Sequence, residues 1–352
     1  MGDDSAKKSE LPKEFLDAHH HFLNTKENSF QSFLGSLVVN EVYLPSHYEA
    51  DVIKPLSEAG VKLVGSVHVE CMPDRGKDEV EWVEESLKRE SSKVSAIVAS
   101  CDLTQPTAEE DVKAILQQSP KVRGIRWILD CVGPYEPNTA THVGTSRHDG
   151  IDYLRGSQGG YDGDVVPAFE RGYALLEKFN LSFDLQCAPS QLKAAARLIQ
   201  KYPNIPVCLN HLGKPRTLLG SDKDNANLSP NKKELESWRE GMKAVAALPN
   251  VTVKISMLGY AVPGWIRSPG RVSLMKELIL ETVQIFGAKR CMVATNWWKS
   301  AAMSDADGLS DIGPDPVQFL TILSEAFKDL SDEDKDRLFC GTAKEFYRIE
   351  LA

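Results

Sequence analysis

Short apolar runs of strand length recur along this chain, and segments with helical periodicity separate most of them. The runs lie at 15–22, 61–69, 93–102, 122–129, 181–187, 206–212, 251–258 and 291–298. The helical segments lie at 78–91, 107–118, 165–179, 189–201, 231–248, 271–286 and 315–328. Continuous apolar strands that alternate with amphipathic helices are typical of a parallel sheet covered by helices. Because there are eight such units, we predict an α/β fold closed into a (β/α)8 TIM barrel.

The chain ends suggest simple domain boundaries. Residues 1–13 are polar and of mixed charge, and we predict a disordered N-terminal lead there. Residues 14–352 are expected to form one barrel domain, a usual length for this fold. The last stretch, 331–349, is expected to be a closing helix pair broken at Gly341.

The connections between the predicted elements are unequal in length. Those that lead from a helix to the next strand are short, such as 179–181 and 202–206. The long ones follow strands, at 23–50, 130–164, 213–230, 259–270 and 299–314. Long strand-to-helix loops emerge together at the C-terminal end of a barrel, where its active site is expected. We expect segment 130–164, the longest, to act as a lid or a wall of the site.

Composition excludes several classes of partner. The 352-residue chain has a formal net charge of −9 and no basic cluster, which argues against nucleic acid and anionic membranes. No apolar run reaches the ~20 residues of a membrane span, and the N-terminus does not resemble a secretory signal. The seven cysteines form no CxxC pair, which favours a cytoplasmic setting. A small-molecule substrate is therefore expected, in a chain that could also form a homo-oligomer.

Three consecutive histidines at the end of the first strand are the sharpest chemical signal. Strand alternation predicts that His19 and His21 point to one face, with Asp17 one step deeper on that face. Two imidazoles so placed can bind one metal ion or one anionic substrate.

Two further strand ends carry candidate site residues. His211 ends the sixth strand within NHLGKP, at the same predicted barrel end as His19 and His21. Arg126 lies late on the fourth strand within VRGIR, where its guanidinium could hold a carboxylate or carbonyl oxygen of a substrate. The alternative role for Arg126 is a structural ion pair.

Polar pairs end two other strands. His68 and Glu70 are expected to share a face of the second strand, and Asp184 and Gln186 a face of the fifth. Each pair could touch substrate or support the residues that do. Weaker candidates are Lys254, Ser256, Trp297 and Trp298, and core packing is the expected role of the two tryptophans.

In this order, these motifs resemble a known family. The matching segments are DAHHHF at 17–22 with its preceding strand, VHVE at 67–70, VRGIR at 122–126, FDLQ at 183–186, LNHLGKP at 209–215, VKIS at 253–256 and GTAKEFYRI at 341–349. Together they resemble the amidohydrolase-2 branch of the amidohydrolase superfamily, TIM-barrel hydrolases related to sugar-acid lactonases. The resemblance spans about residues 14–350. This branch includes hydrolases of fuconolactone, rhamnonolactone and 2-pyrone-4,6-dicarboxylate.

The resemblance implies roles for the site residues. His19, His21 and His211 would face a metal ion, most simply zinc, or the substrate, and Arg126 would bind substrate. The family pattern has an aspartate at the end of the eighth strand, where this sequence has Asn296. If Asn296 cannot serve as base, Asp184 and Glu70 are the candidate carboxylates. Some relatives work without a metal.

These observations favour hydrolysis of a small cyclic ester, a sugar or carboxylated lactone. Water would be activated either by a divalent ion on the three histidines or, without metal, by imidazoles and Arg126 acting on the carbonyl. The alternatives are non-hydrolytic decarboxylation, as in more distant relatives, and a catalytically degenerate barrel that only binds a ligand.

Overall fold

The structure is a computed structural model that describes most of the chain. The described residues are 10–35, 41–90, 92–131, 151–155, 165–215, 218, 228–262, 264–266, 268–297 and 315–351. Residues 1–9 of the predicted lead at 1–13 therefore lie outside them, as do Trp298, the whole of 299–314 and most of the predicted lid at 130–164.

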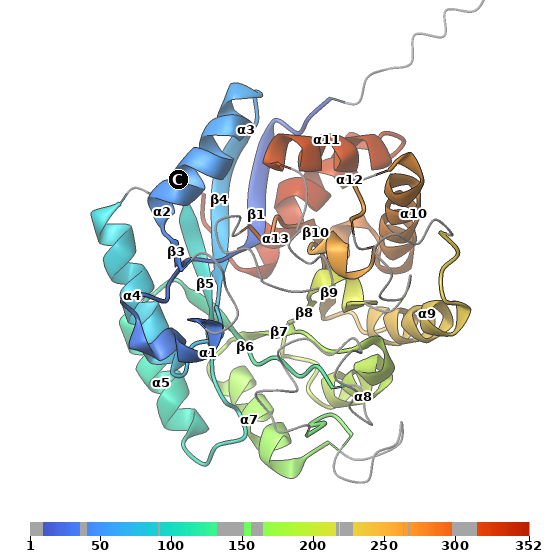
Figure 1. The fold of residues 1–352 in the computed structure, drawn as a ribbon. Coiled ribbons are helices and arrows are strands. Elements are labelled where there is room, and N and C mark those ends of the chain that lie inside the picture. The colour runs from blue at the N-terminus through green and yellow to red at the C-terminus, as the bar shows by residue number, and fades with distance from the viewer. Residues whose placement is uncertain are drawn as a thin grey trace, which may run out of the picture.

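Eight parallel strands form the centre of the molecule (Figure 1). They are β1 Glu14–His20, β4 Lys62–Val69, β5 Val94–Ser100, β6 Val122–Arg126, β7 Ser182–Leu185, β8 Val207–Leu209, β9 Val251–Ile255 and β10 Cys291–Val293, hydrogen-bonded in that order. The first and last strands approach each other through a parallel bridge between His20 and Trp297. The His21 amide donates to the Trp297 carbonyl at 3.3 Å, and the Asn296 amide donates to the His19 carbonyl at 2.8 Å. The predicted eight-stranded TIM barrel is thus confirmed, with its seam closed between the end of β1 and the residues that follow β10.

Helices surround the strands in the expected alternation (Figure 1). They include α2 Pro45–Tyr48, α3 Lys54–Glu58, α4 Gly76–Arg89, α5 Ala108–Gln118, α7 Pro167–Lys178, α8 Leu192–Lys201, α9 Lys232–Ala246, α10 Pro269–Phe286 and α11 Pro316–Ala326. The connection after β1 adds a short antiparallel pair, β2 Leu23–Asn24 with β3 Val42–Tyr43, and the short helix α1 Ser32–Gly35.

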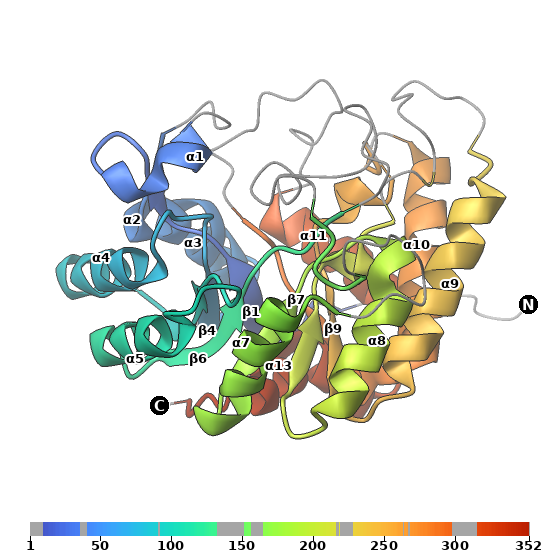
Figure 2. The same ribbon diagram turned by 90° about the horizontal axis from the view of Figure 1, so that it is seen from below.

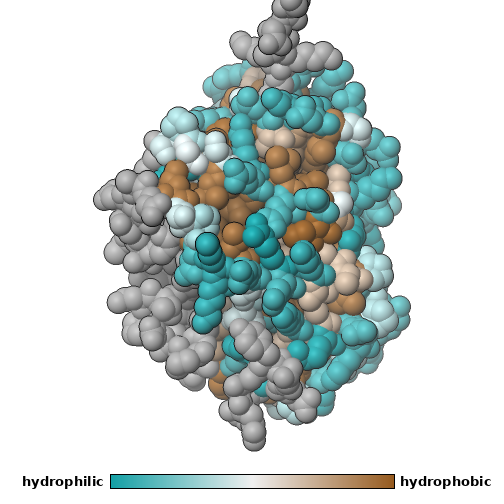
Figure 3. Space-filling model, turned by 90° about the vertical axis from the view of Figure 1, so that its right-hand side faces the viewer, coloured by the Kyte–Doolittle hydropathy of each residue, from teal (hydrophilic) through white to brown (hydrophobic). Residues whose placement is uncertain are grey.

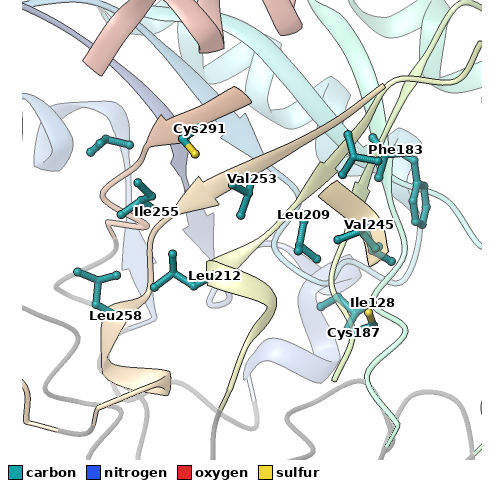
Figure 4. Packing of buried hydrophobic residues seen from close by; sticks show 14 of the residues in the cluster. Ile128, Phe183, Cys187, Leu209, Leu212, Val245, Val253, Ile255, Leu258 and Cys291 are labelled. Atoms are coloured by element: carbon teal, nitrogen blue, oxygen red, sulfur yellow. The ribbon is translucent and has the colours of Figure 1, made fainter. Parts of the chain in front are cut away.

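Strand alternation divides the apolar side chains into two cores. The outer core lies between strands and helices, and Figure 4 shows part of it, with Leu209 of β8 near Val245 of α9 and with Val253 and Ile255 of β9 in the same cluster. The inner core fills the barrel and includes Leu16, Val67, Val98, Cys208 and Met292. Since both faces of each strand are buried, the strands read as continuous apolar runs in the sequence.

The C-terminal segment closes the barrel at the N-terminal end of its strands. Tyr347 and Ile349 belong to the inner core together with Leu16, which lies early on β1. In Figure 2, α13 (Thr342–Phe346) lies at the opposite end of the barrel from α1. The predicted break at Gly341 is wrong: this glycine is helical (φ −60°), and α12 (Asp332–Asp336) continues through a π-helical turn, Arg337–Gly341, into α13. The wider turn keeps the backbone hydrogen-bonded, so no break is needed there.

One face of the molecule carries polar side chains with hydrophobic patches between them. Figure 3 shows this mixture on the side of α9, α10 and α11. Within the described residues, no helix is both long and apolar enough to cross a bilayer.

Candidate active site at the C-terminal ends of the strands

A bulge in β1 decides which histidines enter the barrel. The pairing of β1 with β4 shifts register between Asp17 and His20, so that simple alternation fails there. Ala18 belongs to the inner core, and His19 next to it also faces the barrel residues Arg126 and Lys254. The predicted position of Asp17 on the same face is therefore wrong. Its carboxylate accepts hydrogen bonds from the Tyr48 hydroxyl at 2.7 Å and the Thr295 hydroxyl at 2.6 Å, on the helix side of the strand.

Three imidazoles meet at the centre of the site. The Nε2 atoms of His19 and His21 lie 3.2 Å apart, and the ring centroids of His19 and His211 lie 4.9 Å apart. The three rings are buried. The structure brings these three histidines together, as predicted, but not in a group that could hold a metal ion, so the predicted coordination shell is not found among the described residues.

Arg126 reaches the histidines from β6 but is held in a buried ion pair. Its Nε donates to Glu70 Oε1 at 2.6 Å, and its Nη2 donates to the Glu70 carbonyl oxygen at 2.6 Å. Its Nη1 lies 3.5 Å from His19 Nε2 and 3.4 Å from Gln186 Oε1. The guanidinium therefore forms the structural ion pair considered from the sequence and also faces the histidine cluster, while its predicted role in substrate binding stays a prediction.

A second buried ion pair lies deeper in the barrel. Lys254 Nζ donates to Asp184 Oδ2 at 2.5 Å and lies 3.5 Å from His19 Nδ1. The Tyr347 hydroxyl lies 3.0 Å from each Asp184 oxygen. Asp184 is fully buried and is engaged on both sides, so its arrangement does not support the predicted role of general base. Lys254 was only a weaker candidate from the sequence. Strand alternation with Val253 and Ile255, which face the outer core, already predicts that Lys254 faces the barrel interior.

Gln186 lies just after the end of β7 and faces the barrel interior like Asp184, as predicted. Its amide donates to Asp130 Oδ2 at 3.1 Å, and Asp130 in turn pairs with the buried Lys214. This chain of contacts joins Arg126 to the loop that carries His211. The sequence analysis did not name Asp130 or Lys214 as site residues. The position of Lys214 within NHLGKP, next to His211, was the signal that could have identified this pair.

Left-handed backbone occurs at several of these strand ends. His211, Leu212, Met257 and Asn296 have φ values of 57°, 54°, 49° and 52°. Non-glycine residues adopt this region rarely, and such strain tends to be kept at functional sites. At β8 it turns the His211 ring toward β9, where Nδ1 lies 2.8 Å from the Ser256 hydroxyl oxygen.

Asn296 lies just after the eighth strand, at the position where the family pattern has an aspartate. Its Oδ1 lies 3.3 Å from His21 Nε2, and its Nδ2 donates to Met257 Sδ at 2.9 Å. The side chain therefore touches the histidine cluster, but it cannot accept a proton near neutral pH. Trp297 next to it lies in the buried outer core, as predicted.

His68 does not join the site, contrary to the expectation that it shares a face with Glu70. Its Nδ1 accepts from the Phe22 amide at 3.3 Å, and its Nε2 lies 4.0 Å from Glu79 of α4. Val67 and Val69 on either side belong to the inner core, so His68 faces the helices. Glu70 turns back toward Arg126 beyond the end of the strand.

Burial sets the charge of the imidazoles. Burial, then the Lys254 charge, lowers the pKa of His19 well below its usual range. Burial, then the Arg126 charge, lowers the pKa of His21 to about 3. Both rings are therefore neutral near pH 7 and can take part in hydrogen bonds as donor or acceptor.

The cluster does not fit a divalent metal ion in this arrangement. Across the described ranges, no group of three or more His, Cys, Asp or Glu side chains is arranged so that it could hold one. Two cationic side chains also lie against His19, one beside each ring nitrogen at 3.5 Å. Each of the two cations is paired with one carboxylate, Glu70 or Asp184, and Asn296 adds no further negative charge that would attract a metal cation.

Comparisons with known proteins agree with this barrel fold. The family model described as Amidohydrolase matches residues 16–349, and the chain belongs to this family. The chain is 25% identical to an L-fucono-1,5-lactonase of Burkholderia ambifaria, with 95% of this chain and 96% of the relative covered. A crystal structure of a Burkholderia multivorans amidohydrolase with bound zinc is 21% identical with a TM-score of 0.65, covering 96% of this chain and 99% of that chain. An amidohydrolase 2 from Bifidobacterium longum subsp. infantis is 17% identical with a TM-score of 0.58, covering 96% and 99%.

Proposed function

We propose that this chain hydrolyses a small lactone, a sugar lactone or a carboxylated one, without a catalytic metal ion. The observation that carries the proposal is the convergence of His19, His21 and Arg126 at one barrel end. A neutral imidazole pair beside a guanidinium can donate to a carbonyl oxygen and accept a proton from water. The distant L-fucono-1,5-lactonase relative supports the substrate class.

The reaction would proceed by addition of water to the ring carbonyl. Arg126 and one imidazole donate hydrogen bonds to the carbonyl oxygen as it becomes negative. A second imidazole takes a proton from the water, whose oxygen forms the new bond to carbon. The ring C–O bond then breaks, and its oxygen receives that proton, leaving an open hydroxy acid. An imidazole is assigned this role because Glu70 and Asp184 are both engaged in ion pairs.

A lactone panel tests the proposal directly. Purified protein treated with a chelator is given L-fucono-1,5-lactone, related sugar lactones and 2-pyrone-4,6-dicarboxylate. Ring opening is monitored by measuring the acid that it releases. Opening of at least one lactone by metal-free protein supports the proposal. Activity that disappears with the chelator and returns with zinc contradicts the metal-free route. Release of carbon dioxide from a ring that stays closed indicates decarboxylation instead.

Binding of a lactone without turnover is the second candidate. Asn296 favours it, because the eighth strand offers an amide that cannot act as base. Calorimetric binding of a lactone that is never opened would support this candidate.

We also infer that the chain works in a reducing compartment such as the cytoplasm. The cysteines of the described residues are buried, and no disulfide joins them. Free buried thiols are typical of reducing compartments.

A further inference from the structure

The shortest contact of His21 fixes where its proton lies. His21 Nδ1 is 2.8 Å from the carbonyl oxygen of Val69. A carbonyl oxygen can only accept, so Nδ1 must carry the hydrogen. In a neutral imidazole the other nitrogen then has none, so His21 Nε2 is an acceptor and its 3.3 Å contact with Asn296 Oδ1 is not a hydrogen bond.

This assignment determines the proton on His19. Its Nε2 lies 3.2 Å from His21 Nε2, which can only accept. The contact is a hydrogen bond only if His19 Nε2 carries the hydrogen and donates it. His19 Nδ1 is then unprotonated, and it faces Lys254 Nζ at 3.5 Å.

Lys254 is suited to hold that state. An ammonium group has three hydrogens and no lone pair, so it can only donate. Asp184 accepts one of these hydrogens at 2.5 Å, and the ammonium also lies 5.2 Å from the centre of the Tyr347 ring. The Lys254 side chain is fully buried, so this orientation is held by protein contacts.

The donors therefore all point the same way, from Lys254 to His19, from His19 to His21, and from His21 to the Val69 carbonyl. Arg126 stands outside this chain: its Nε and Nη2 donate to the two Glu70 oxygens at 2.6 Å, and its Nη1, the nitrogen that faces His19, donates to Gln186 Oε1 at 3.4 Å. A His19 Nε2 that carries hydrogen has no lone pair for a metal ion, which agrees with the poor fit of the cluster to a divalent cation.

We propose that Lys254 is a positioning residue that keeps His19 in the Nε2–H form, so that the site presents a fixed donor, His19, beside a fixed acceptor, His21. Its catalytic meaning rests on the proposed lactone hydrolysis: His21 Nε2 accepts the water proton, and His19 Nε2–H donates to the carbonyl oxygen. The protonation pattern itself does not depend on that function.

Nitrogen-15 NMR of protein with labelled histidine tests the pattern. In chelator-treated wild type, His19 is expected to show an unprotonated Nδ1 and a protonated Nε2, and His21 the reverse. His19→Gln and His21→Gln identify the two sets of signals by their loss. A protonated His19 Nδ1 in the wild type would overturn the proposal.

A charge-balanced double variant tests the role of Lys254. Lys254→Met with Asp184→Asn removes the ammonium without leaving a buried carboxylate unpaired. We expect the Nδ1–H form of His19 to appear, kcat on the best lactone to fall about 100-fold, and KM to change less than about threefold. The matched control is Lys276→Met with Glu325→Gln, an exposed pair 3.2 Å apart, which should change neither.

Each outcome separates the two proposals. A double variant with the wild-type NMR pattern and wild-type kcat overturns the role of Lys254 while leaving lactone hydrolysis intact. A protein that opens no lactone yet shows the expected NMR pattern, lost in the double variant, supports the positioning role and overturns the proposed function.

Discussion

The hydroxyl of Tyr347 lies 3.0 Å from each carboxylate oxygen of Asp184. Tyr347 follows the last helix, whereas Asp184 lies on the fifth barrel strand, 163 residues earlier. The segment that closes the barrel therefore reaches the ion pair beneath His19. Burial, then the Asp184 charge, raises the pKa of Tyr347 well above its usual range, so the hydroxyl stays protonated and donates.

Tyr347→Phe removes this donor and should destabilise the fold. We expect a loss of about 1.5–3 kcal/mol in the free energy of unfolding, the range for hydrogen bonds to charged groups. Urea unfolding measures it. Tyr202→Phe is the control, because its hydroxyl donates to Glu170 at 3.2 Å in a partly exposed position and its loss should cost less. Equal losses in the two variants would contradict the structural role given to Tyr347.

Arg126→Met should damage both stability and turnover. It leaves the buried Glu70 carboxylate without its guanidinium, which costs about 3–5 kcal/mol for a buried pair. Adding Glu70→Gln should restore most of the unfolding free energy, while lactone turnover stays lost because the guanidinium beside His19 is missing. Recovery of turnover together with stability would show that Arg126 serves only the ion pair.

Asn296→Asp should create affinity for zinc. Asn296 Oδ1 now lies 3.3 Å from His21 Nε2, so the new carboxylate would lie beside that nitrogen. It would add a negative charge to the histidine cluster. We expect zinc affinity by calorimetry to rise at least about tenfold, since an anionic oxygen ligand strengthens cation binding. The exposed Asn204→Asp is the control. Tight zinc binding by the wild type would contradict the poor fit found for the native cluster.

Acid should destabilise the protein through its buried histidines. Burial lowers the pKa values of His19, His20, His21 and His68, and that of His21 falls to about 3. The unfolded chain binds protons below about pH 6.5, where these folded rings do not, so stability present above pH 6.5 is lost as pH falls. Each histidine contributes about 1.4 kcal/mol per pH unit until its folded pKa is reached.

His68→Gln isolates one of these contributions. Because His68 lies outside the proposed catalytic cluster, its replacement should reduce the slope of unfolding free energy between pH 6 and pH 4.5 by about 1.4 kcal/mol per unit. The exposed His47→Gln is the matched control and should leave the slope as in wild type. An unchanged slope in His68→Gln would indicate that this ring is protonated in the folded protein.

The sequence alone determined the barrel and the location of its site. Apolar periodicity is a local property, so the eight strands, their helices and the C-terminal position of His19, His21, His211 and Arg126 could all be predicted. The inward orientation of Asp184 and Gln186 could also be predicted, from the alternation of side chains along their strand.

Only the tertiary structure decided which of these side chains meet and in what state. The β1 bulge turned Asp17 away from the face of His19, because register depends on pairing with β4 and not on β1 alone. The pairs Arg126–Glu70 and Lys254–Asp184 join residues 56 and 70 positions apart, and no local pattern encodes such partners. These pairs placed two cations beside His19, and it is their charge and hydrogen-bond direction that set the chemistry of the cluster.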